Sequence, residues 1–113
     1  MPRFVVLEHD WPEPHLDLFL DAGDALRAWK LPAHFSPDIP ATILANAQHR
    51  RQYLDYEGAV AGNRGVVRRW DFGDFDWIED SQESVRVNFT GTRLRGIFEF
   101  ARTDSGDWIF RKV

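Results

Sequence analysis

The 113-residue sequence contains no cysteine, which removes two classes of site at once. No disulfide can cross-link the fold and no thiolate can bind a metal, so any metal site must use nitrogen and oxygen ligands. The sequence also has no apolar run long enough to span a bilayer, and its amino terminus lacks a charged-then-apolar leader pattern. We therefore expect a cytoplasmic protein without membrane contact.

Basic residues are fewer than acidic ones, with 14 Lys and Arg against 18 Asp and Glu. The formal net charge is −4, which disfavours a protein that coats nucleic acid through charge alone. The basic residues are unevenly placed, however, with five in residues 1–57 and nine in residues 58–113, so one face can be basic although the whole chain is acidic. The length predicts a single domain over residues 1–113.

Apolar residues alternate with polar ones along much of the chain, which is the period of a β-strand. Gly, Asp and Pro turns separate these runs at roughly ten-residue spacing, a pattern typical of an antiparallel sandwich or a small barrel. Predicted strands are Arg3–Glu8, His15–Leu20, Ala25–Leu31, Ala41–Gln48, Val66–Phe72, Asp74–Ile78, Val85–Phe89, Leu94–Ala101 and Trp108–Lys112. For the third of these, a short helix over Asp21–Lys30 is the competing interpretation.

Two histidines and a carboxylate lie within nine residues, at His9, His15 and Asp17. In a strand that begins at His15, His15 and Asp17 share one face, so we expect this polar pair to be displayed and the alternating leucines to be buried. The proline-containing loop before His15 can bring His9 beside them. Two imidazoles and a carboxylate make a partial shell for a divalent transition metal; ordinary polar residues at strand ends are the alternative.

The segment Gln48–Gly58 is polar, aromatic and basic without a clear period. It therefore predicts an irregular surface segment, the kind of element that often carries functional residues.

Several motifs in this order resemble the phosphoesterase domain at the amino terminus of bacterial DNA ligase D proteins and its free-standing relatives. The family pattern H-x5-H-x-D is matched by His9, His15 and Asp17. The later matches are Ala28–Pro32 for a tryptophan-proline strand end, Gln48–Gly58 for D-H-x3-Y-x-D-[FY]-E-G, Trp70–Gly73 for W-D-x-G, Val87–Gly96 for F-x-L-x-G-x-x-L-x-G, and Trp108–Lys112 for a closing tryptophan strand.

The resemblance implies a small antiparallel β-barrel, all-β apart from short helical or 3-10 turns in its loops. It implies a Mn²⁺-dependent enzyme that trims nucleic acid 3′ ends in DNA repair, by removing a 3′-phosphate or a terminal ribonucleoside from a primer-template. By position, His9, His15 and Asp17 would bind the metal, for which Zn²⁺ and Co²⁺ are alternatives, and His49 and Tyr53 would contact the phosphate. A DNA ligase or polymerase on another chain would be a partner.

Three basic residues of the family pattern are missing. Phe19 stands where the family has an arginine two residues past the metal aspartate, Ala33 replaces a lysine and Ala41 replaces an arginine. Because phosphoryl transfer depends on charge stabilisation, these losses are expected to weaken catalysis unless other cations replace them.

Four arginines near the phosphate segment are candidate replacements. Arg50 and Arg51 are the predicted phosphate contacts, with Arg64 and Arg68 as further candidates. Three functions therefore stay open: a 3′-end-processing phosphoesterase, a catalytically weakened adaptor that binds metal and nucleic acid, and a metal-dependent phosphoesterase for a small phosphorylated substrate.

Overall fold

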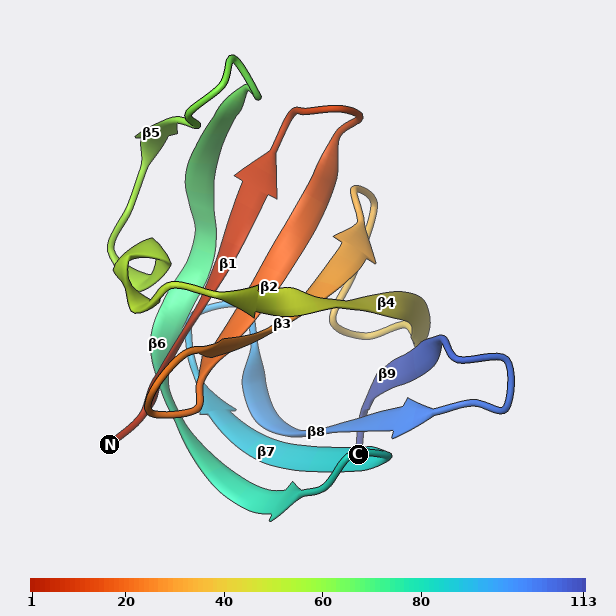
Figure 1. The fold of residues 1–113 in the computed structure, drawn as a ribbon. Helices are drawn as coiled ribbons and strands as arrows, with labels where there is room; N and C mark the ends of the chain where they lie inside the picture. Colours follow the sequence, from red (N-terminus) through yellow and green to blue (C-terminus); the bar gives the residue numbers. More distant parts are fainter.

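Antiparallel strands make up most of the chain. The computed structural model describes residues 1–113 (Figure 1). In chain order its elements are β1 (Arg3–His9), β2 (His15–Asp21), β3 (Leu26–Pro32), β4 (Ala41–His49), the 3-10 helix η1 (Arg51–Leu54), β5 (Gly58–Ala59), β6 (Val66–Asp80), β7 (Ser84–Thr90), β8 (Arg95–Arg102) and β9 (Trp108–Lys112). No helix in the structure has the length and apolar character needed to cross a membrane.

Eight of the strands close into a ring. The order β1-β2-β3-β4-β9-β8-β7-β6 returns to its start because β6 also pairs with β1, and β5 adds only a short edge to β6. Closure leaves few unpaired backbone groups along the sheet, which protects it against pairing with other chains. The prediction of an all-β antiparallel fold with a 3-10 turn in a loop is confirmed.

β6 is the strand that closes the ring, and it corrects one prediction. The sequence predicted two short strands around Gly73, but the structure has one strand of 15 residues. Its first half pairs with β1 and its second half with β7, and the change occurs near Gly73. A Cβ at Gly73 would lie 2.5 Å from the Thr90 carbonyl oxygen, so glycine lets the strand continue through this close approach.

The β2–β3 connection is a hairpin, as predicted, and the competing helix over Asp21–Lys30 is wrong. β2 and β3 pair in register from His15↔Pro32 to Asp21↔Leu26. At the turn, Gly23 has φ +100° and its N–H donates to the Asp21 carboxylate at 3.0 Å. Glycine takes this left-handed conformation without the steric cost of a side chain.

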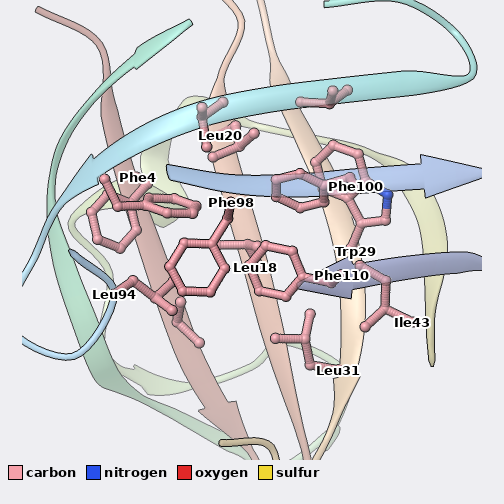
Figure 2. Close-up of a cluster of buried hydrophobic side chains, with 14 of the residues drawn as sticks. Phe4, Leu18, Leu20, Trp29, Leu31, Ile43, Leu94, Phe98, Phe100 and Phe110 are labelled. Atoms are coloured by element: carbon pink, nitrogen blue, oxygen red, sulfur yellow. The ribbon is translucent and has the colours of Figure 1, made fainter. Parts of the chain in front are cut away.

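The interior of the ring is filled by aromatic and branched side chains (Figure 2). The Phe110 ring lies 5.0 Å from Phe98 and 4.4 Å from Phe100, measured between centroids. Trp29 packs against Phe100 at 4.4 Å. Each fully buried Phe or Leu side chain stabilises the fold by ~1.5–3 kcal/mol, so this cluster is the main source of stability.

A second apolar cluster lies on the outer face of β1, β2 and β3. It consists of Val5, Leu7, Phe19, Leu26, Ala28, Leu54 and Val67. Leu54 belongs to η1, and the segment around it covers this face from outside the ring, beside β1 and β6 in Figure 1. As a result, every residue of β2 is buried.

The structure overturns the prediction that His15 and Asp17 are displayed to solvent. Their exposed fractions are 8% and 9%, although they do lie on the face opposite the leucines. Alternation correctly separated the two faces of β2. The error was to assign one face to solvent, because strand alternation carries no information about a distant segment that folds over it.

Asp71 anchors the β7–β8 turn to β6. Its buried carboxylate accepts the backbone N–H groups of Thr92 at 3.0 Å, Arg93 at 3.0 Å and Leu94 at 2.7 Å. These three donors would otherwise be unsatisfied, and hydrogen bonds to a charged acceptor are stronger than neutral ones. The carboxylate therefore sets the conformation of the turn.

We expect Asp71→Asn to lower the free energy of unfolding by at least ~2 kcal/mol, because an amide replaces one acceptor oxygen by a donor that faces N–H groups. Urea unfolding measures the change. Asp76→Asn, on the exposed face of the same strand, is the matched control and should change stability by less than ~0.5 kcal/mol. Equal effects of the two substitutions would contradict the anchoring role.

Candidate metal centre and adjoining clefts

Three polar side chains meet at the loop end of the β1–β2 hairpin. His9 pairs directly with His15, and Asp17 follows two residues later on the same face of β2. The imidazole centroids are 5.0 Å apart, and one candidate ligand atom from each of the three residues lies within 4.8 Å of the others. The structure thus brings together the three residues that the sequence predicted as metal ligands.

Backbone carbonyls select the tautomer of each histidine. His9 Nε2–H donates to the Arg64 carbonyl at 2.9 Å, and His15 Nδ1–H donates to the Glu13 carbonyl at 2.8 Å. In a neutral imidazole the other nitrogen carries a lone pair and no hydrogen. The free nitrogens are therefore Nδ1 of His9 and Nε2 of His15, which lie 3.3 Å and 3.2 Å from an Asp17 carboxylate oxygen.

Three acceptor atoms thus converge with no donor between them. Converging lone pairs in a largely buried site are unfavourable unless protons on both rings or a cation lie among them. As metal ligands, two imidazole nitrogens and one carboxylate oxygen fit a divalent transition ion. The carbonyls behind both rings are the partners that orient metal-binding histidines in proteins.

The smaller of two clefts beside this cluster has a volume of about 230 Å³. It gathers all five residues that the sequence predicted as catalytic, namely His9, His15, Asp17, His49 and Tyr53. The last two come from the end of β4 and from η1, so the covering segment completes the cleft.

Phe19 orders the two predicted phosphate contacts. Its buried ring lies 4.9 Å from the His49 ring and 6.0 Å from the Tyr53 ring, and these two rings are 5.8 Å apart. Aromatic pairs in this distance range stabilise one another beyond their area burial. The residue that replaces the family arginine is therefore part of the wall that supports His49 and Tyr53.

The small cleft also contains two polar side chains that the sequence analysis did not predict, Lys30 and Asn46. Lys30 is directly opposite Asp17 in the β2–β3 register, and Asn46 is opposite Ala28 in the β3–β4 register. The register of the predicted β2–β3 hairpin is the sequence signal that places Lys30 beside Asp17.

The four candidate arginines are dispersed. Arg50 and Arg51 do not line either cleft, and the Arg51 guanidinium is bound to Asp21, so their predicted role as phosphate contacts stays a prediction without geometric support. The Arg64 guanidinium donates to the Ala61 carbonyl at 2.7 Å. Arg68 lines the larger cleft.

That larger cleft has a volume of about 470 Å³ and shares His9 and His15 with the smaller one. The Arg93 guanidinium lies over the Trp70 ring at 4.6 Å, and both residues line the cleft together with Arg68. Its carboxylates are Glu8 and Asp10. The two histidines therefore stand at the junction of two open spaces.

A model of the DNA ligase D 3′-phosphoesterase domain matches residues 7–102 of this chain. The chain belongs to this family. The resemblance that the sequence motifs indicated is thereby confirmed. The matched region contains the three converging residues as well as His49 and Tyr53. No curated protein matches the sequence.

In this 3′-phosphoesterase-family domain, two ion pairs hold the covering segment in place. Arg51 binds the Asp21 carboxylate with two hydrogen bonds of 3.2 Å and 2.7 Å, at the start of η1. Arg3 binds Asp55, which follows η1, at 2.8 Å and 3.2 Å. Together with the buried Leu54 side chain between them, these pairs position Tyr53 over the cleft.

These contacts lower the pKa values of two carboxyl groups. The Arg51 guanidinium holds the pKa of Asp21 below its usual range, with burial opposing this effect and the Gly23 N–H reinforcing it. The Arg3 guanidinium likewise lowers the pKa of Asp55. A carboxyl whose pKa is lower in the folded state stabilises that state at neutral pH, and this contribution is lost as the pH falls through the folded pKa.

We expect the stability difference between wild type and an Asp21→Asn/Asp55→Asn variant to be largest near pH 7 and to shrink below the usual carboxyl pKa. Urea unfolding between pH 7 and pH 3 measures it. Because both pairs are partly exposed and screened by solvent, the difference should also fall at high salt. A difference that grows on acidification would contradict the assigned direction.

Metal binding should stabilise the folded domain and depend on His15. We expect saturating Mn²⁺, Zn²⁺ or Co²⁺ to raise the Tm of wild type, since a ligand at 100 times its Kd adds ~2.7 kcal/mol. The ion-induced shift should disappear in His15→Ala and persist in His34→Ala, a control in an exposed loop. The same shift in both variants, or none in wild type with any of the three ions, would refute the centre.

Proposed function

We propose that the domain is a metal-dependent phosphoesterase that removes a 3′-phosphate or a 3′-terminal ribonucleoside from nucleic acid ends during DNA repair. The observation that carries the proposal is the convergence of His9, His15 and Asp17 acceptor atoms beside a cleft that His49 and Tyr53 also line. Membership in the 3′-phosphoesterase family supports this choice over other metal-dependent reactions.

The metal that we propose is Mn²⁺, held by His9, His15 and Asp17. When bound by these residues, such an ion would polarise a phosphate oxygen and stabilise charge that develops during hydrolysis. The chain's part is to present two nitrogens and one carboxylate oxygen in fixed orientation, which the Arg64 and Glu13 carbonyls secure. The fit is to nitrogen and oxygen ligands, so Zn²⁺ and Co²⁺ remain the ions to compare with Mn²⁺.

Hydrolysis of a 3′-phosphate joins a water oxygen to phosphorus and breaks the bond between phosphorus and O3′. The products are inorganic phosphate and a 3′-hydroxyl, which must gain a proton as it leaves. His49 Nδ1–H donates to the Ala47 carbonyl at 2.7 Å, so Nε2 faces the reaction. In the imidazolium form Nε2–H would hold a phosphate oxygen or deliver that proton to O3′, and a neutral imidazole would remain. The Tyr53 hydroxyl is a second donor in the same cleft.

The rest of the nucleic acid strand has room in the larger cleft, which continues from His9 and His15. Arg68 and Arg93 supply positive charge there, and Trp70 supplies an aromatic ring. Phosphate contacts from arginine dominate affinity for nucleic acid, whereas aromatic rings bind bases without sequence preference. A DNA ligase or polymerase on another chain would use the 3′-hydroxyl that the reaction leaves.

A catalytically weakened adaptor is the second candidate, and Phe19 is the observation that favours it. Its ring is buried where the family has an arginine, so no cation can act from that position. An adaptor would keep metal and nucleic acid binding without turnover. A phosphoesterase for a small substrate is the third candidate, favoured only by the net negative charge.

We expect wild type with Mn²⁺ to release inorganic phosphate from a recessed primer-template that ends in a 3′-phosphate. His15→Ala should lose this release, and the exposed-loop variant His34→Ala should keep it. Malachite-green assay of phosphate and gel analysis of the primer end measure both products of the same reaction.

Two other outcomes would replace the proposal. If wild type binds Mn²⁺ and primer-template, with affinity that falls steeply with salt, but releases no phosphate or ribonucleoside, the adaptor is correct. If it hydrolyses a small phosphate ester and binds primer-template without salt dependence, the small-substrate enzyme is correct.

A further inference from the structure

Lys30 is a cation without a partner beside the candidate metal centre. It lies on β3 opposite Asp17, half-buried, and lines the small cleft. The Lys30 ammonium makes no hydrogen bond or ion pair with any side chain, whereas Arg3, Arg27 and Arg51 each pair with a carboxylate. A half-buried ammonium without an ion-pair partner is unfavourable, so an anionic ligand in the cleft would stabilise it.

The charges of the small cleft favour a dianion. Lys30 is its only Lys or Arg, and Asp17 is its only carboxylate. With a divalent ion on Asp17 and the two histidines, the positive charges exceed the negative ones by two. A terminal phosphate group carries close to two negative charges at neutral pH, whereas an internal phosphodiester carries one.

No arginine of the chain lines the small cleft. Phe19, the neighbour of Asp17 on the same face, is apolar, and Arg51 is bound to Asp21 outside the cleft. Arg68 and Arg93 line the other cleft. Lysine suits the task because its flexible stem carries a compact ammonium with three donors.

We propose that Lys30 binds the non-bridging oxygens of a terminal phosphate monoester in the small cleft, which His49 and Tyr53 also line. The inference rests on the proposed function for the identity of the substrate, but phosphate binding by Lys30 can be tested apart from catalysis. Lys30 thereby supplies on β3 the charge that Phe19 lacks on β2, and it directs the site toward terminal monoesters in preference to internal diesters.

The test compares Lys30→Met, which keeps length and removes charge, with Lys30→Arg, which keeps charge. Lys112→Met removes the other lysine of the chain, exposed on β9, and is the matched control. Inorganic phosphate is titrated by calorimetry into each Mn²⁺-loaded protein, and Mn²⁺ affinity is measured separately. We expect Lys30→Met to raise the Kd for phosphate about ten- to a hundredfold, as for loss of a charged hydrogen bond, with Mn²⁺ affinity unchanged.

Lys30→Arg should retain most phosphate affinity, and Lys112→Met all of it. For 3′-phosphate hydrolysis, Lys30→Met should lower kcat/KM by at least the factor lost in phosphate binding. Phosphate binding that is absent in wild type, or equal in Lys30→Met and wild type, overturns the role of Lys30. Phosphate binding that depends on Lys30 in a protein that hydrolyses no 3′-phosphate leaves Lys30 assigned and instead overturns the proposed function.

Discussion

The convergence of lone pairs at His9, His15 and Asp17 is the constraint on which the rest of the site depends. Each imidazole is oriented by a backbone carbonyl on its far side, at Glu13 or at Arg64, so the ring nitrogens that face the carboxylate have no freedom to become donors while neutral. The arrangement is unfavourable unless protons on both rings or a cation lie among the three atoms. This requirement, together with the nitrogen and oxygen ligands, is the basis on which we propose a metal ion here.

The outer face of β2 connects the stability of the strand ring with the formation of the candidate site. β2 contributes leucines to the interior and His15, Asp17 and Phe19 to the outer face, where Phe19 packs in one cluster with Leu54. Because Tyr53 is on the segment around Leu54 and His49 immediately precedes it, the element that buries the outer cluster also completes the cleft. Anchoring of the segment by Arg3 and Arg51 is therefore a condition for a formed site as well as for a stable fold.

Sequence reasoning recovered what local pattern determines. Alternation placed the strands, glycine and aspartate marked the β2–β3 turn, and the spacing of His9, His15 and Asp17 identified the cluster that the register brings together. What it missed depends on contacts between distant segments. β6 continues through Gly73 past the close approach of Thr90, and Phe19 on the outer face of β2 packs with Leu54, which lies 35 residues later in the chain. Lys30 was missed for a different reason, since its position follows from the hairpin register and not from any motif.

The proposed role of Lys30 bears on the replacement of the family arginine by Phe19. The Phe19 ring packs against both the His49 and the Tyr53 rings. That change removes a cation from β2, and the lysine on the neighbouring strand lies opposite the aspartate of the same face. Since electrostatic stabilisation depends on where a charge lies and not on which strand carries it, moving a cation by one strand can preserve the field at the phosphate. If Lys30 binds phosphate as we propose, loss of the arginine would change the geometry of phosphate binding, and the adjacent strand would supply the charge.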